Sequence, residues 1–315
     1  VVEIGAFERP ESIALLRRLV PRLSETEADL LAERVGDLPL AVHQAAAWHA
    51  VTDGTVEDYL RLFDRRLSER TGPDSSGEEL PRLLAAGVSL NLDLLREHDP
   101  VAWALLELWA VFDPEPVSCG LLSAGGTADL PDELRELLAD ETRLRDAMRD
   151  ISRFSLARFD EESGTLQVHR LVRAILNDRL LEEDLRRARE HVHAILAGAT
   201  PSKPPTVEST WARRAEITPH IIPSGVLDSD DFDIRVVGID QADFLYQSGE
   251  YEGTRRLAET ALGTWLDRYG PDDDLVLDIS RVLANALRGL GDNRAAAELS
   301  EDNLTRTRRK FGVDH

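Results

Sequence analysis

The stretch that decides the fold is residues 155–173, SLARFDEESGTLQVHRLVR. Apolar and polar side chains alternate over residues 155–159 and 165–168, which is the pattern of half-buried β-strands. The polar residues between them end in Gly164, which adopts a positive φ at little cost, so the stretch predicts a β-hairpin. After residue 168, apolar residues recur at helical spacing. His169 lies at this junction, where a histidine either caps the next helix or contacts a ligand.

Helical patterns precede the hairpin. Apolar residues at helical spacing predict helices over residues 100–111, 130–138 and 142–153. Three helices followed by a hairpin predict a winged-helix domain with a β-hairpin wing. We place it at residues 80–198, with helix resuming after the hairpin.

The first 75 residues predict a helical domain with a short strand at residues 1–4. A helix over 8–20 precedes Ser24, which begins a capping box completed by Glu27. Pro39 is tolerated in a first turn and starts the third helix, and a fourth helix starts at Thr55. The Gly-, Ser-, Asp- and Pro-rich residues 71–79 predict a linker.

The C-terminal part contains an internal repeat. Residues 199–227 form a proline-rich connector and a docking segment with Trp211 and His220, and within residues 228–315 Gly249 matches Gly291 at an offset of 42. This period is typical of stacked helical hairpins in an α-solenoid. The side chains expected to line its concave groove can form hydrogen bonds to a peptide or protein partner; they are Asp243, Tyr246, Gln247, Asn285 and Arg288.

Composition narrows the function classes. The net charge of −22 opposes binding to nucleic acid or anionic lipid. The sequence contains no run of about 18 apolar residues, which a membrane-spanning helix would need. Cys119 is the single cysteine, so no internal disulfide is possible. We therefore expect a cytoplasmic protein, and the start without methionine suggests a piece of a longer one.

No catalytic or metal site is expected in this chain. His191 and His193 lie two positions apart on a helix and hence on different faces, which is poor metal-ligand spacing. Residues 118–120, Ser-Cys-Gly, lack the strand-turn-helix context of a nucleophile elbow.

Three stretches together carry a family resemblance. Residues 33–48, ERVGDLPLAVHQAAAW, residues 156–176, LARFDEESGTLQVHRLVRAIL, and the 42-residue repeats resemble, in this order, parts of bacterial STAND-class NB-ARC ATPases with tetratricopeptide repeats. The resemblance implies a mainly α-helical chain: an ARC-type helical domain, a winged helix and then tetratricopeptide hairpins.

The resemblance also implies residue roles. In this family a P-loop domain holds ADP or ATP with Mg²⁺, the Leu38-Pro39-Leu40 segment would lie against base and sugar, and His169 would approach the β-phosphate of ADP. Arg170 stands where many members have Asp. No Gly-x-x-x-x-Gly-Lys-Ser/Thr motif occurs, so this chain alone is not expected to bind nucleotide tightly or to act as an enzyme.

The function expected from the resemblance is that of a regulatory part in a nucleotide-dependent signalling switch. The winged helix would gate nucleotide in the P-loop domain, while a partner on the repeats would favour homo-oligomer formation. Alternatives are a nucleotide-independent scaffold and part of a transcription regulator. Direct DNA contact is disfavoured, because the wing residues Asp160, Glu161 and Glu162 would repel phosphates.

Overall fold

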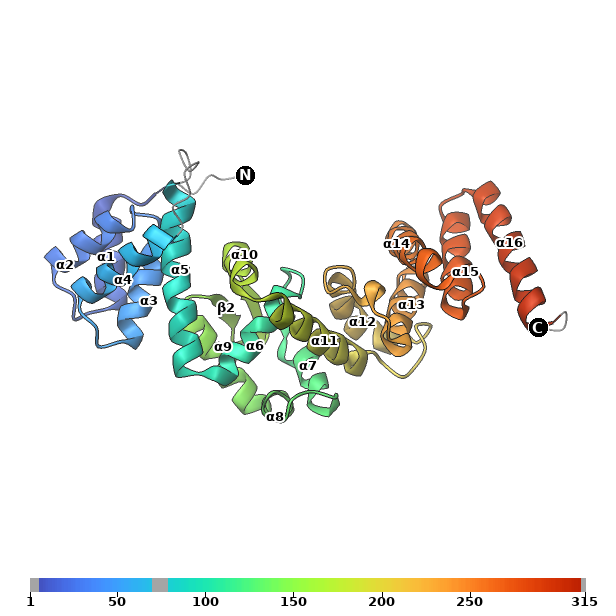
Figure 1. The fold of residues 1–315 in the computed structure, drawn as a ribbon, viewed down its shortest axis with the longest axis horizontal. Helices are drawn as coiled ribbons and strands as arrows, with labels where there is room; N and C mark the ends of the chain where they lie inside the picture. Colours follow the sequence, from blue (N-terminus) through green and yellow to red (C-terminus); the bar gives the residue numbers. More distant parts are fainter. Residues whose placement is uncertain (1–5, 70–78, 313–315) are drawn as a thin grey trace. The chain divides into compact units, whose positions relative to one another are not determined.

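The structure is a computed structural model that describes residues 6–69 and 79–312. This part of the chain is mainly α-helical, with a small three-stranded sheet (Figure 1). None of its helices is long and apolar enough to cross a membrane. The strand predicted at residues 1–4 lies outside the described residues, as does the predicted linker except Glu79, which begins a helix.

The chain divides into two compact units. The first comprises residues 1–110, 116–119 and 140–185, and the second comprises residues 111–115, 120–139 and 186–315. Each is described by itself below.

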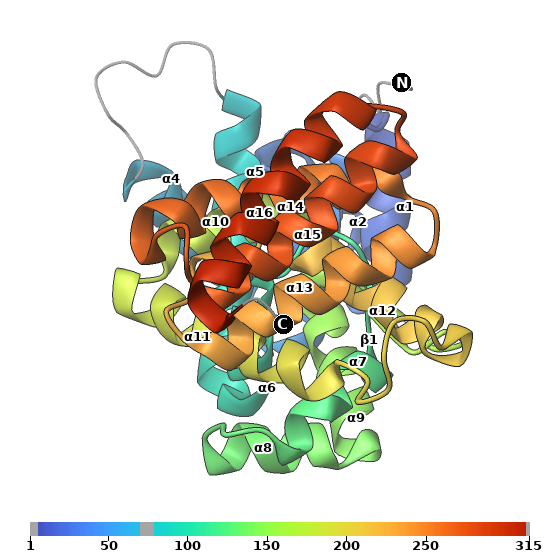
Figure 2. The same cartoon turned by 90° about the vertical axis from the view of Figure 1, so that its right-hand side faces the viewer.

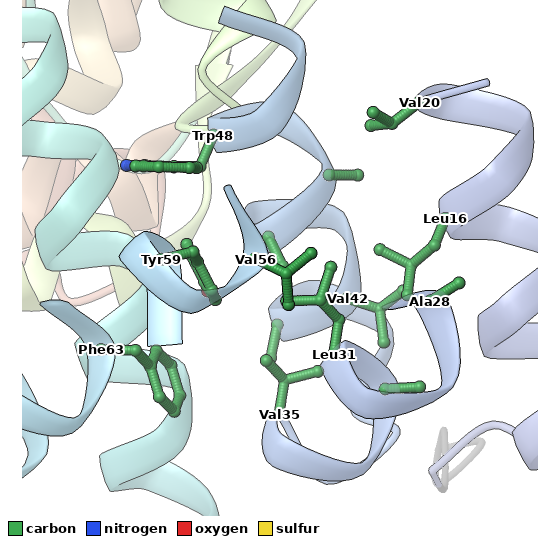
Figure 3. Packing of buried hydrophobic residues seen from close by; sticks show 14 of the residues in the cluster. Leu16, Val20, Ala28, Leu31, Val35, Val42, Trp48, Val56, Tyr59 and Phe63 are labelled. Atoms are coloured by element: carbon green, nitrogen blue, oxygen red, sulfur yellow. The ribbon is translucent and has the colours of Figure 1, made fainter. Parts of the chain in front are cut away.

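The first unit begins with four helices around one apolar core: α1 Arg9–Leu19, α2 Glu25–Arg34, α3 Pro39–Val51 and α4 Val56–Glu69. The predicted capping box is confirmed, since Ser24 and Glu27 bond to each other's backbone N–H groups. Figure 3 shows the core side chains, among them Leu16, Leu31 and Phe63, each fully buried. Their burial from four helices is the main source of stability in this cluster.

Helix α5, Glu79–His98, was not among the predicted helices. It packs against α3 and α4, and Ala86 and Leu90 complete the core that those helices share. Gly87 allows the close approach, because a Cβ there would lie 3.3 Å from the Gln44 Cβ. Contacts from distant residues rather than local capping signals therefore define α5.

The sheet contains the predicted hairpin and one additional strand. Strands β2 Ala157–Asp160 and β3 Thr165–Val168 pair antiparallel, and β1 Val117–Ser118 pairs with the other edge of β3. Gly164 has φ +64°, as the hairpin required. β1 is two residues long, so it carries no alternation that the sequence could reveal. Helix α9 Glu141–Arg153 packs against β2, and α6 Pro100–Glu107 packs against α9. Helix α10 Arg170–Arg179 follows β3 in the chain.

The second unit includes α8 Asp132–Ala139, most of α11 Glu182–Ala199 and α12 Trp211–Ile217. Between α11 and α12, the connector is fixed to the helices that follow. Trp211 Nε1 donates to the Pro205 carbonyl at 2.8 Å, and the Trp211 ring lies 6.1 Å from that of Phe244. His220 Nδ1 accepts from the Asp113 N–H at 3.1 Å.

The 42-residue period is present in the helix bounds. Helices α13 Phe232–Gln247 and α14 Tyr251–Tyr269 form one hairpin, and α15 Asp274–Gly289 and α16 Asn293–Phe311 form the next. Consecutive helices pack side by side (Figure 1 and Figure 2). The matched glycines Gly249 and Gly291 both have positive φ, +85° and +88°, which accounts for their recurrence at the turn.

Candidate functional site

The prolyl segment forms the start of α3. Leu38 is the N-cap residue and Pro39 the first helical residue, where its missing N–H leaves no partner unsatisfied. Gly36 and Asp37 before it have φ of +71° and +54°. Leu38, Pro39 and Leu40 are all half-buried, and Leu38 packs against the core of the first four helices.

Arg9 fixes the backbone that leads into this segment. Its guanidinium contacts both carboxylate oxygens of Asp37 at 2.9–3.1 Å. Burial by itself would raise the pKa of Asp37, but the hydrogen bonds from Arg9 outweigh it and leave the pKa below its ordinary value. Asp37 therefore stays ionised and bound at neutral pH.

His169 is the N-cap residue of α10. Its Nδ1 accepts a hydrogen bond from the Leu171 N–H at 3.2 Å, and the residue is exposed. Partial burial of the ring, followed by the nearby Arg170 charge, lowers its pKa. The neutral ring that accepts at Nδ1 carries its proton on Nε2, so its outer edge is a hydrogen-bond donor.

A buried polar network joins α3 and α5 to the turn before β2. Asn91 Nδ2 donates to the Gln44 backbone oxygen at 3.0 Å and also to Gln44 Oε1. Gln44 Nε2 donates in turn to the Ser155 carbonyl, and His43 Nδ1 lies 2.7 Å from Ser155 Oγ. Gln44 and Asn91 are fully buried. In the sequence, the network is indicated only by two amide side chains, Gln44 and Asn91, that each lie among apolar residues.

A second connection ties α10 to α5 and α4. Asp93 of α5 accepts from Arg179 of α10 with one carboxylate oxygen and from Arg66 of α4 with the other. Arg179 also donates to the Ser89 carbonyl at 2.8 Å. The helix capped by His169 is thus attached at its far end to α5, which packs against α3, the helix that begins with the prolyl segment.

We expect Asp93→Asn to lower the free energy of unfolding of the first unit by about 1–2 kcal/mol, because two partly buried guanidinium groups lose a shared carboxylate. Urea unfolding measures the change. Asp64→Asn is the matched control. Asp64 of α4 pairs with Arg34 of α2, but both side chains are about half exposed, so its cost should stay below about 0.5 kcal/mol. Equal effects of the two substitutions would contradict the prediction.

Two arginines of α9, the helix that precedes the hairpin, pair with acidic side chains. Arg149 contacts both carboxylate oxygens of Glu161, in the turn between β2 and β3, at 2.6 and 2.9 Å, and Arg145 pairs with Glu141 at 3.1 Å. These contacts hold the pKa of Glu161 below its ordinary value. Two arginines that could have met a phosphate backbone are therefore already engaged.

The five side chains predicted for the repeat groove lie on α13 and α15. Asp243 is half-buried and pairs with Arg281 at 3.5 Å, and burial raises its pKa. The Tyr246 ring packs 5.6 Å from that of Tyr251, while Gln247 is exposed. Asn285 Oδ1 accepts from Arg288 at 2.7 Å.

Asn285 also lines a groove of about 500 Å³ between α15 and α16. The sequence analysis assigned none of the other residues in this groove to partner binding. The residues of α16 at the groove are Ser300, Asn303, Leu304, Thr307 and Phe311.

Among the residues that the structure describes, no group of three or more His, Cys, Asp or Glu side chains is placed to hold a metal ion. Cys119 is buried with its Sγ 3.4 Å from Met148 Sδ, and burial raises the pKa of its thiol. Both observations fit a packing role for this cysteine.

Comparison with known proteins gives one family match. A family described as "Domain of unknown function (DUF7779)" matches residues 94–185, which run from α5 into α11 and include the sheet and His169. No curated protein matches the chain.

Proposed function

We propose that this chain is the regulatory part of a nucleotide-dependent signalling switch of the STAND NB-ARC type. An ARC-like helical domain and a winged helix would gate ADP or ATP, with Mg²⁺, in a P-loop domain. Tetratricopeptide hairpins would bind a protein or peptide and control oligomerisation. The observation that carries the proposal is His169, exposed at the N-cap of α10 with its Nδ1 already engaged.

The residues present suit a nucleotide. The outer edge of the His169 ring can donate to a phosphate oxygen, and Arg170 beside it is exposed and adds positive charge. The half-buried Leu38, Pro39 and Leu40 offer apolar surface of the kind that packs against a base. The phosphate of bound nucleotide would contact His169 in the closed state but not in the open state. This difference in contact would make the affinity for nucleotide differ between the two states.

His169→Ala should weaken ADP binding about 10- to 100-fold in the full-length product of the gene that encodes this chain, because a hydrogen bond to a charged group is lost. Isothermal titration with ADP measures the affinity. We also expect the variant to oligomerise more readily in light scattering.

His98→Ala serves as the control, since His98 is an exposed histidine at the end of α5. It should bind ADP as the unchanged protein does. ADP affinity that stays the same in His169→Ala would sink the phosphate role and leave His169 as a helix cap alone.

A nucleotide-independent scaffold is the second candidate, and the groove between α15 and α16 is the observation that favours it. Partner capture that persists in His169→Ala and without ADP would support this candidate. A third candidate is that the chain is part of a transcription regulator. Because Arg149 is already paired with Glu161, DNA contact would then have to come from another domain.

A further inference from the structure

We propose that His43 and Gln44 of α3 are positioning residues for His169, and that they act by holding Ser155, which follows α9. Through this contact the prolyl segment and His169 keep a fixed distance from each other. The proposal rests on the nucleotide role given above to these two parts of the site. The distance itself can be measured without nucleotide.

The backbone of Ser155 has a conformation that favours glycine, since its φ of +57° lies in the left-handed region, where a Cβ is disfavoured. The Ser155 N–H donates to the Ser152 carbonyl at 2.9 Å, and the next N–H, of Leu156, donates to the Ile151 carbonyl at 3.3 Å. These two bonds form a Schellman motif at the end of α9, in which the residue at position 155 is usually glycine. A serine here indicates that its side chain makes a contact that offsets the backbone cost.

Two neighbouring residues of α3 make that contact. His43 Nδ1 lies 2.7 Å from Ser155 Oγ, and Gln44 Nε2 donates to the Ser155 carbonyl. The Gln44 amide is held in this orientation because its Oε1 accepts from Asn91 Nδ2. Gln44 and Asn91 are fully buried, so water cannot replace a lost partner without entering the core. The hydroxyl and the carbonyl of Ser155 are therefore both bound to one turn of α3.

These bonds lie outside the apolar core that α1 to α5 share. Among the residues that the structure describes, that core includes none from the hairpin, which buries apolar residues of its own such as Leu166 and Val168. Apolar packing is not directional, whereas a hydrogen bond weakens steeply when its angle changes. The bonds to Ser155 therefore fix the start of the hairpin relative to α3 more closely than apolar contacts could.

A short path leads from Ser155 to His169. Strand β2 begins at Ala157, shortly after Ser155, and Ala157 pairs with Val168 at the end of β3. His169 follows Val168 directly and caps α10. On the other side, the prolyl segment begins the same helix that carries Gln44, so both belong to one rigid element. A displacement of Ser155 from α3 would therefore also move His169 relative to the prolyl segment.

Distances between two spin labels test the positioning role. The labels are attached at Glu33→Cys on α2 and Ala174→Cys on α10, two exposed sites, in a chain whose single native cysteine is replaced by Cys119→Ala. We expect one narrow distance distribution in this chain and a broader one after His43→Leu or Ser155→Gly. His43→Asn is the matched control and should keep the narrow distribution, because its amide can still bond to the Ser155 hydroxyl. Equal widths in all four chains overturn the proposal.

Stability and ADP affinity separate this role from a purely structural one. Glycine adopts a positive φ freely, so Ser155→Gly should unfold at the same urea concentration as the unchanged chain or at a higher one. In the full-length gene product it should nevertheless bind ADP at least about fivefold more weakly. Weaker ADP binding in His169→Ala together with unchanged binding in Ser155→Gly overturns the positioning role alone. Unchanged binding in His169→Ala refutes the nucleotide role, while the spin-label distances still decide whether α3 holds the hairpin.

Discussion

Replacing Arg214 with alanine should lower the free energy of unfolding of the second unit by about 3–5 kcal/mol, which is the usual cost of removing one partner from a buried ion pair. The Arg214 side chain is fully buried. Its Nε and Nη2 donate to the two carboxylate oxygens of Asp240, each at 2.9 Å. The substitution leaves Asp240 in a site where its side chain is only 18% exposed.

The same guanidinium also holds the proline-rich connector. It donates to the Lys203 carbonyl at 2.8 Å, to the Pro201 carbonyl at 3.3 Å, and to Thr210 Oγ1. Arg214→Lys keeps the charge but not the planar set of donors, so we expect it to recover less than half of the loss. Hydrogen exchange should rise first in peptides from residues 201–215 and 235–245.

Arg213→Ala is the matched control for Arg214. Arg213 is the preceding residue, and its ion pair with Glu216 at 2.6 Å lies on the surface. Its removal should cost less than about 0.5 kcal/mol in the same urea experiment. If the two alanine variants unfold at the same urea concentration, Arg214 does not hold the connector to α13.

Local signals in the sequence located many of the elements. The Ser24 capping box, the first-turn position of Pro39, the positive φ of Gly164 and the 42-residue period each depend on residues close together in the chain. Such features follow from backbone sterics and hydrogen bonding over a few residues, which is why a single sequence carries them.

Contacts between residues that are far apart in the sequence could not be predicted from such local signals. Arg214 finds Asp240 across 26 residues, and Gln44 finds Ser155 across 111. Helix α5 and strand β1 likewise depend on what they pack against. For the candidate site, one part was predictable from the sequence and the other was not. The sequence located His169 at a helix start, whereas its linkage through Asp93 required the three-dimensional arrangement of α4, α5 and α10.

The cluster of the first four helices should lose stability as pH falls from about 6.5 to about 4, because of His49. This residue is 2% exposed, and its ring lies 4.8 Å from that of Trp48 and 5.5 Å from that of Tyr59. Burial first, and then the charge of Arg22, lower the pKa of His49 to about 4 from its ordinary 6.5. Between these values the unfolded chain takes up a proton that the folded chain does not, so acid favours unfolding.

At pH 4.5, protonation of His49 in the unfolded chain should lower the free energy of unfolding by roughly 2–3 kcal/mol, because its pKa is about 4 in the folded chain and 6.5 in the unfolded chain. His49→Phe keeps an aromatic ring beside Trp48 and removes the titrating group, so its stability advantage over the unchanged chain should grow as pH falls. His98→Phe changes an exposed histidine and should leave the pH dependence as it was. Hydrogen exchange of peptides within residues 40–62, measured from pH 7 to 4.5 and corrected for intrinsic rates, compares the three proteins. A parallel decline of His49→Phe and the unchanged chain would assign the acid sensitivity to other groups. A steeper decline in the unchanged chain alone assigns it to the buried imidazole.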